Sequence, residues 1–307
     1  MIDFTAMPRK KKAYAGANGS KIAVVYEGAQ YMLKFPPVAI RNKNLSYSNS
    51  CISEYIGCHV FSIVGIPVQE TMLGTYMVKG VKKVVVACRD FTSYGVVLQD
   101  FASLKNQIID SERNGYGTEL DEILSTFEAQ TVMDPVKLER RFWEMFIVDA
   151  LIGNWDRHNG NWGFLYNTQT DQMELAPVYD CGSCLYPQAD EDIIREILNN
   201  QQEMEHRVYD VPTSAIMKNG KRINYFKIIS SLQYPGCNEA LAHIVPQISM
   251  EQIGAMIREI PCITPLQKEF YLTMLQQRKE HILEYSFQKL RALDRAKKPT
   301  WKERDSR

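Results

Sequence analysis

Four side chains that could carry out chemistry lie close together in the middle of the chain. Asp156, His158, Asn161 and Asp180 all fall within residues 151–186. Two carboxylates and a carboxamide that meet in a small space repel one another unless a cation lies between them. Hard oxygen ligands of this kind suit Mg²⁺, so the stretch indicates a metal-phosphate centre.

A β-hairpin is expected to bring these side chains together. Residues 162–178 are first aromatic and apolar, then rich in turn residues, then apolar again. This pattern predicts a strand, a loop and a second strand. The open ends of a hairpin lie side by side. We therefore expect Asn161, just before the hairpin, to neighbour Asp180, just after it, with Asp156 on the incoming loop.

The whole-chain composition sets the class of protein. At 307 residues the chain can form two lobes or one large domain. Lys plus Arg and Asp plus Glu both number 36, so nothing in the charge balance indicates a nucleic-acid or membrane partner. The N-terminus has no apolar run of signal-peptide length, and no run elsewhere approaches the roughly 18 apolar residues of a membrane span. Seven cysteines without a framework spacing indicate a reducing compartment. We expect a cytoplasmic protein, with signal-independent export into a host left open.

The first 90 residues predict a mainly β unit that carries one helix. A glycine-containing turn, GANGSK at residues 16–21, precedes a strand at 22–26. Its backbone N–H groups could approach a phosphate, and Ser20 and Lys21 could add side-chain donors. Most such stretches, however, are plain hairpin turns, and the turn alone does not decide between the two.

Two charged side chains of this unit are candidates for a cleft. Lys34 alternates with Leu33 and Phe35 in a predicted strand, so its side chain leaves on the opposite face. Such a lysine is either simply exposed or reaches into a cleft. Glu54 lies off the middle of the apolar stripe of a helix predicted at residues 50–65, where it would be solvated or would pair with a cation.

Helical periodicity dominates after an expected hinge at residues 89–93. A long helix begins with Asp134 as N-cap and Pro135 at its first position, and becomes almost wholly apolar over residues 146–152. It is expected to be buried and to lead into the 151–186 stretch. Residues 190–207 are charged and polar, helical at best, and suit a mobile segment beside the site. The pair Cys181 and Cys184 has no second such pair with which to form a structural zinc site.

These parts follow the order found in protein kinases, which use a glycine-rich loop, a strand lysine paired with a helix glutamate, and a catalytic aspartate. Asp156 and Asn161 have the spacing of the catalytic Asp and the metal-binding Asn, and Asp180-Cys-Gly182 has the shape of Asp-Phe-Gly. Arg157 and His158 follow the catalytic position, whereas in ordinary protein kinases a His-Arg pair precedes it. That arrangement resembles the phosphoinositide kinases and the HipA-like bacterial kinases.

The wider pattern is similar to the HipA family, and within it to the short CtkA-type serine/threonine kinases. The strings GANG, YMLKFPP, SEYIGCH, GNWDRHNGNWG and DCGSCLYPQAD carry the resemblance, which extends from Gly16 to about Lys289. It implies an α+β, bilobal, protein-kinase-like fold. A small β-rich ATP-binding lobe with one main helix would span residues 1–90, and a larger helical catalytic lobe residues 91–307.

The resemblance also implies roles for individual residues. Asp156 would orient or deprotonate the acceptor hydroxyl, His158 would support the loop by hydrogen bonding, and Asn161 and Asp180 would hold Mg²⁺ on the nucleotide phosphates. On the ATP side, the implied residues are the phosphate-contacting Lys34 with its partner Glu54, the loop residues Gly16, Ala17, Asn18, Gly19, Ser20 and Lys21 over the phosphates, and Cys88, Asp90 and Phe91 at the adenine.

The implied function is an ATP- and Mg²⁺-dependent serine/threonine protein kinase that phosphorylates protein hydroxyls, its own included. A phosphoinositide or small-molecule kinase and a non-catalytic nucleotide-binding regulatory module remain alternatives. No strongly amphipathic basic helix favours a lipid substrate.

Two departures from the HipA pattern bear on partners and regulation. HipA toxins have an extra N-terminal subdomain that takes part in antitoxin contact, whereas this chain begins almost at the glycine loop, so an antitoxin-like partner is left open. Residues 13–15 read Ala-Tyr-Ala where those toxins carry the serine that they autophosphorylate, and Ser20 is a local alternative.

Overall fold

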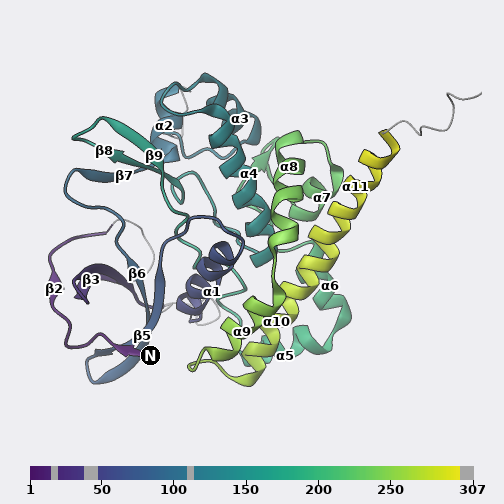
Figure 1. Ribbon diagram of the computed structural model, residues 1–307. Helices are drawn as coiled ribbons and strands as arrows, with labels where there is room; N and C mark the ends of the chain where they lie inside the picture. The colour runs from purple at the N-terminus through teal and green to yellow at the C-terminus, as the bar shows by residue number, and fades with distance from the viewer. Residues whose placement is uncertain (15–19, 38–47, 109–113, 298–307) are drawn as a thin grey trace, which may run out of the picture.

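A six-stranded sheet forms the N-terminal part of the structure. The structure is a computed structural model, and it describes residues 1–14, 20–37, 48–108 and 114–297. The strand order is β1-β5-β6-β4-β3-β2. The strands are β1 (Ile2–Asp3), β2 (Arg9–Lys10), β3 (Lys21–Tyr26), β4 (Ala29–Lys34), β5 (Thr71–Val78) and β6 (Val81–Arg89). Helix α1 (Ser50–Ile63) packs on β5 and β6, between the sheet and the helical part of the molecule (Figure 1).

Alternation along β4 decides where its lysine points. Tyr31 and Leu33 face a small core on the outer side of the sheet, whereas Met32 packs against the large core on the side of α1. Lys34 has the parity of Met32, so its side chain leaves toward α1. The register of β3 and β4 places Lys21 directly opposite Lys34. Two lysines therefore lie side by side on the face that looks toward the helical part.

A second sheet contains the expected hairpin. Strands β8 (Gly163–Asn167) and β9 (Gln172–Leu175) pair antiparallel with Phe164 opposite Leu175, which confirms the hairpin. A third strand, β7 (Val96–Asp100), pairs with β8 and was not predicted. A Cβ at Gly163 would lie 2.1 Å from the carbonyl oxygen of Gln99, so only glycine allows this approach. Helix α2 (Phe101–Ile108) follows β7 directly.

Helices make up most of the chain after β7. They are α3 (Leu120–Ala129), α4 (Pro135–Ile152), α5 (Glu191–Asn199), α6 (Gln201–Tyr209), α7 (Tyr225–Ser231), α8 (Pro235–Ile244), α9 (Met250–Glu259), α10 (Pro265–Arg278) and α11 (Tyr285–Lys297), with a 3₁₀ turn at Val245–Gln247 and a π-helical turn at Lys279–Glu284. A short hairpin, β10 (Met217–Lys218) and β11 (Lys221–Arg222), lies between α6 and α7. The α+β organisation expected from the sequence is confirmed.

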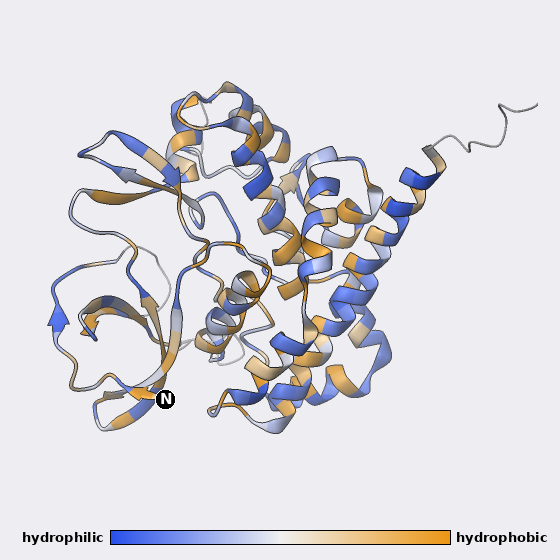
Figure 2. Cartoon of the chain, viewed as in Figure 1, coloured by the Kyte–Doolittle hydropathy of each residue, from blue (hydrophilic) through white to orange (hydrophobic). Residues whose placement is uncertain are grey.

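Helix α4 is the centre of the helical part. Its N-cap Asp134 accepts a hydrogen bond of 3.0 Å from the backbone N–H of Val136, and Pro135 occupies the first position, as predicted. Its apolar second half is buried, and the hydrophobic residues gather between the packed helices (Figure 2). The helix ends at Gly153, whose φ of 62° is left-handed. Within the described residues, no helix is long and apolar enough to cross a membrane.

The charged segment after residue 190 is helical. Asp190 caps α5 and Asn200 caps α6 through their side-chain oxygens. Ile194 and Ile197 of α5 are buried, and α5 packs against α10. The expectation of helical structure here is confirmed, whereas that of a mobile segment beside the site stays a prediction.

Candidate active site

The loop that carries Asp156 is held from below by buried polar side chains. Asn154 is fully buried, and its Oδ1 accepts a hydrogen bond of 3.1 Å from the backbone N–H of Asp156. The Nδ2 of Asn154 donates to Asp149 of α4 at 2.9 Å. Tyr225 of α7 donates its hydroxyl to the carbonyl of Asn154 at 2.6 Å. Through Asn154, helices α4 and α7 therefore hold the backbone of Asp156 in place without a ligand.

Arg157 joins the loop to Tyr179, in the segment that follows β9. Its Nε lies 3.0 Å from Oδ2 of Asp149, and both side chains are almost fully buried. Its Nη1 donates to the carbonyl of Asn161 at 2.8 Å and also to the carbonyl of Tyr179. The arginine thereby sets the separation between Asn161 and the residue before Asp180.

Sequence reasoning gave Arg157 no role, although a signal was available. Asp149 stands alone in the otherwise apolar run at residues 146–152. A carboxylate in a buried helix requires a cationic or hydrogen-bonding partner. The nearest cation beyond the helix end is Arg157, eight residues later.

Asn161 and Asp180 lie just outside the two open ends of the hairpin, and Arg157 bonds to the backbone of Asn161 and of Tyr179, the residue before Asp180. The Nδ2 of Asn161 donates to the carbonyl of Asp156 at 2.8 Å, which leaves the amide oxygen as the group that could ligate a cation. Asp180 has a left-handed φ of 59°, an uncommon conformation for a residue other than glycine. Its side chain is 42% exposed, and its Oδ1 lies 2.9 Å from Nζ of Lys34. The Lys34 charge lowers the pKa of Asp180 to about 2, so the carboxylate is ionised at neutral pH.

Lys34 connects the two lobes. Its Nζ lies 2.8 Å from Oε2 of Glu54, which is 1% exposed. The other oxygen of Glu54 accepts a hydrogen bond of 3.1 Å from the backbone N–H of Cys181. Of the two expectations for Glu54, pairing with a cation is what the structure shows, and the same carboxylate also holds the residue after Asp180 in place.

Asp156 and His158 lie in one tight turn. The backbone N–H of His158 donates to the carbonyl of Asp156 at 2.8 Å, and the ring Nδ1 accepts from the backbone N–H of Gly160 at 3.0 Å. Burial raises the pKa of the Asp156 carboxyl, and the charges of His158 and Arg222 act in the opposite direction. A base with a raised pKa is better matched to a proton near neutral pH.

The hinge side chains have internal partners. The carboxylate of Asp90 is bonded to Lys12 at 2.6 Å, to Tyr14 at 2.7 Å and to Gln30 at 2.7 Å. Burial opposes ionisation of this carboxyl, but the hydrogen bonds from Lys12, Thr92 and Tyr14 lower its pKa to about 2. Asp90 therefore holds Lys12 and Tyr14, which precede the glycine turn, against the expected hinge.

Cys88 and Phe91, the other residues of the expected adenine site, lie near the end of β6 and just after it. Cys88 is fully buried in β6, and the half-buried ring of Phe91 lies 5.9 Å from that of Tyr179. Ser20 is exposed and Lys21 is half-buried; burial and the neighbouring Lys34 charge lower the pKa of Lys21. Gly16, Ala17, Asn18 and Gly19 fall outside the described residues.

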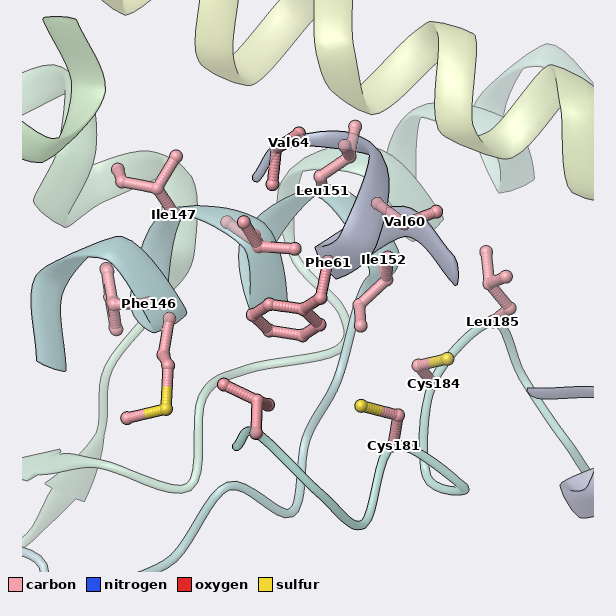
Figure 3. Close-up of a cluster of buried hydrophobic side chains, with 14 of the residues drawn as sticks. Val60, Phe61, Val64, Phe146, Ile147, Leu151, Ile152, Cys181, Cys184 and Leu185 are labelled. Atoms are coloured by element: carbon pink, nitrogen blue, oxygen red, sulfur yellow. The ribbon is translucent and has the colours of Figure 1, made fainter. Parts of the chain in front are cut away.

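The segment after Asp180 is fastened to the core. Cys181 and Cys184 are fully buried and lie among apolar side chains that include Phe61 and Ile152 (Figure 3). Leu185 donates its backbone N–H to the carbonyl of Ile152 at 3.0 Å. In the part of the chain that the structure describes, no group of three or more His, Cys, Asp or Glu residues could hold a metal ion.

The same segment is also tied to the helix that carries Glu54. Asn49, the N-cap residue of α1, donates its backbone N–H to Pro187 at 3.0 Å and its side chain to the carbonyl of Ala189 at 2.8 Å. Gln267 of α10 donates in turn to the side chain of Asn49 at 3.3 Å. Residues 182–190 thus have hydrogen bonds to both lobes.

Comparison with known proteins identifies relatives across most of the chain. The family model for the HipA-like C-terminal domain matches residues 12–257. The serine/threonine-protein kinase CtkA of Helicobacter pylori strain J99 is 44% identical over 285 residues, which are 92% of this chain and 86% of that protein. The crystal structure of a Helicobacter pylori proinflammatory kinase CtkA has a TM-score of 0.90 at 42% identity and covers 95% of this chain and 98% of that one.

A more distant solved structure shares the fold. HipA of Shewanella oneidensis MR-1, solved in a complex with HipB and operator DNA, has a TM-score of 0.54 at 17% identity, over 93% of this chain and 67% of that one. The bilobal organisation that the sequence resemblance implied is therefore confirmed.

Proposed function

The chain belongs to the family of HipA-like C-terminal domains and is a serine/threonine protein kinase of that type, and we propose that it uses ATP and Mg²⁺ to phosphorylate protein hydroxyls, its own included. We take residues 1–90 as its ATP-binding lobe and 91–307 as its catalytic lobe. The observation that carries the proposal is the meeting of Lys34, Glu54 and Asp180 opposite the rigid loop that holds Asp156 and Asn161.

The donor groups of the site fit a nucleotide phosphate with Mg²⁺. Asp180 is ionised and partly exposed, and the amide oxygen of Asn161 is left for a cation. Opposite them, Lys21 and Lys34 form adjacent positive charges that an anionic ligand would relieve. Bound there, Mg²⁺ would neutralise charge on the transferring phosphoryl group.

Catalysis on the protein side would come from positioning and charge. Asp156 accepts the proton of the acceptor Ser or Thr hydroxyl. The hydroxyl oxygen bonds to the γ-phosphorus of ATP, the bond from that phosphorus to the bridging oxygen breaks, and ADP leaves. Lys34, oriented by Glu54, holds the phosphates in line. The buried network beneath Asp156 keeps the base in place without reorganisation during the transfer.

The test is phosphate transfer from labelled ATP to the chain itself and to a general acceptor protein. We expect Asp156→Asn and Asp180→Asn each to lower the rate at least about 100-fold, because one loses the base and the other a metal ligand. Asp210→Asn, which removes a carboxylate that is 61% exposed, is the matched control. Transfer by either site variant at the wild-type rate would show that the assignment is wrong.

Two further arms separate this proposal from its alternatives. Transfer to phosphoinositide vesicles and to no protein would favour a lipid kinase, and ATP binding without transfer to any acceptor would favour a regulatory module.

The free thiols of all seven cysteines, six of them buried, support action in a reducing compartment.

A further inference from the structure

The β10–β11 hairpin is a rigid element beside the catalytic loop. Its two turn residues, Asn219 and Gly220, have φ values of 52° and 73°, as a type I′ turn requires. The backbone N–H of Gly220 donates to the side chain of Glu119 at 2.8 Å, and that of Met217 donates to the carbonyl of Thr118 at 2.8 Å. The hairpin is therefore held at its turn and at its base by the segment that enters α3.

The register of the hairpin separates its basic side chains. Lys218 pairs with Lys221 and Met217 with Arg222, so the two lysines share one face and Arg222 lies on the other. Lys218 lies 5.0 Å from the ring centroid of Tyr234, away from the catalytic loop. Arg222 and the two lysines therefore point to opposite sides of the hairpin.

Arg222 reaches the catalytic loop. Its Nη2 donates to the carbonyl of Trp155 at 3.0 Å, and Trp155 is the residue before Asp156. The positive charge of Arg222 also acts against the burial that raises the pKa of Asp156, which reflects the closeness of the two groups.

Most donors of this guanidinium remain available to a ligand. A guanidinium has five N–H donors, and the bond to Trp155 is made by Nη2 alone. Arg222 is exposed, and the ion pairs among the described residues include none between Arg222 and a carboxylate. The nearby Glu119 is engaged at Gly220. The cations of the nucleotide side, Lys21 and Lys34, project instead from the sheet of the other lobe.

We propose that Arg222 is a specificity-determining residue that binds an anionic side chain, a carboxylate or a phosphate, close in sequence to the acceptor Ser or Thr of the protein substrate. The inference rests on the proposed kinase function, because Asp156 marks where the acceptor hydroxyl lies. A guanidinium anchored one residue from that base meets the residues that flank the acceptor. It pairs with carboxylates and phosphates in a bidentate geometry.

Neutral peptides with one Ser acceptor test this inference. Each position flanking the Ser is occupied in turn by Glu, phosphoserine, Gln or Lys, and kcat/KM is measured. For the wild type we expect Glu or phosphoserine to exceed Gln about fivefold at one or two positions, the size of an exposed ion pair. Arg222→Glu is expected to reverse the order at those positions, so that the Lys peptide becomes the best. A preference for phosphoserine over Glu would identify phosphate as the ligand, and equal preference would identify charge.

Lys221→Glu is the matched control, because it makes the same change in charge one residue away on the opposite face of the hairpin. It should keep the wild-type preference. The inference is wrong if Arg222→Glu keeps the wild-type order, or if it slows every peptide and the acceptor-free hydrolysis of ATP equally, which would assign Arg222 to the transferred phosphoryl group. A wild type that phosphorylates all peptides alike refutes only this inference, whereas a wild type that phosphorylates no acceptor refutes the proposed function.

Discussion

The two sides of the active site are held together by different means. Beneath the catalytic loop, Asp149, Asn154 and Arg157 are at most 5% exposed and bond to one another or to backbone. On the nucleotide side, Lys34 and Asp180 meet at 2.9 Å with side chains that are 14% and 42% exposed. The first arrangement fixes a shape, whereas the second leaves charged groups that a ligand can reach.

The difference follows from the cost of burying charge. A buried ion pair contributes little net stability, but removal of one partner leaves an uncompensated charge in the interior. A partly exposed pair is weakened by water and can exchange one partner for another. We therefore expect substitutions beneath the catalytic loop to act mainly on folding, and substitutions on the nucleotide side mainly on activity.

The largest effect on folding is expected for Arg157→Met. Asp149 would stay buried without its cation, and we expect the free energy of unfolding to fall by about 3 to 5 kcal/mol. Denaturant unfolding measures this loss. Arg195→Met, which removes an exposed pair with Glu191, is the control and should cost less than about 0.5 kcal/mol. Similar losses in the two variants would contradict the comparison.

Lys34→Met should act mainly on activity, whereas Arg157→Met acts mainly on folding. We expect kcat/KM for ATP to fall about 100- to 1000-fold, because the phosphates lose a charged donor. The free energy of unfolding should fall by less than in Arg157→Met, since Asp180 remains in contact with water and the buried Glu54 keeps the hydrogen bond from the backbone N–H of Cys181. Lys82→Met, at an exposed position of β6, is the matched control for kinetics. A Lys34 variant that unfolds more readily than the Arg157 variant would reverse our view of the two sides.

Asp90, on the nucleotide side, should make the free energy of unfolding depend on pH. Its pKa in the folded chain is about 2 against an ordinary value of 3.8, so the ionised carboxylate stabilises the fold above about pH 4 and this contribution is lost as the pH falls toward about 2. The difference corresponds to about 2 kcal/mol. Urea unfolding from about pH 7 to about pH 2 should show wild type and Asp90→Asn converging in acid. A constant gap over this range would rule out the explanation.

The smallest effect is expected for Asn159→Ala. The Nδ2 of Asn159 donates to the carbonyls of Gly115 at 2.9 Å and Gly117 at 2.8 Å, which ties a neighbouring loop to the catalytic loop. We expect a loss of about 1 to 2 kcal/mol in the free energy of unfolding. Asn199→Ala, at an exposed helix end, should change it by less than about 0.5 kcal/mol. Equal losses would mean that Asn159 contributes nothing to the loop.

Local pattern predicted the elements whose signals are local. The hairpin at residues 162–178 follows from alternating apolar and turn-rich runs, and the start of α4 from Asp134 and Pro135. The direction of Lys34 follows from strand alternation alone. Each of these depends on residues a few positions apart, which is the range over which propensity and periodicity act.

The features that were missed depend on distant contacts. Strand β7 forms because Gly163 lets Gln99 approach, more than 60 residues away in sequence. The clamp by Arg157 needs the carbonyl of Tyr179 and the carboxylate of Asp149 together. For Glu54 the periodicity alone allowed solvation or pairing; the partner Lys34 came from the family resemblance, and the packing of α1 against the sheet brings the two side chains to 2.8 Å. Their partners are set by tertiary packing, which a single sequence does not display.

The hydrogen bonds that hold residues 182–190 bear on how the kinase could be regulated. Leu185 and Tyr186 hold left-handed φ values of 53° and 54° within it, and Asn49 binds it to α1. Many kinases are switched on when a phosphorylated loop becomes ordered, but here the corresponding segment is already part of the core. Phosphorylation of residues 182–190 would therefore find no disordered loop to order, because the backbone of this segment is already hydrogen-bonded to Asn49 and to Ile152.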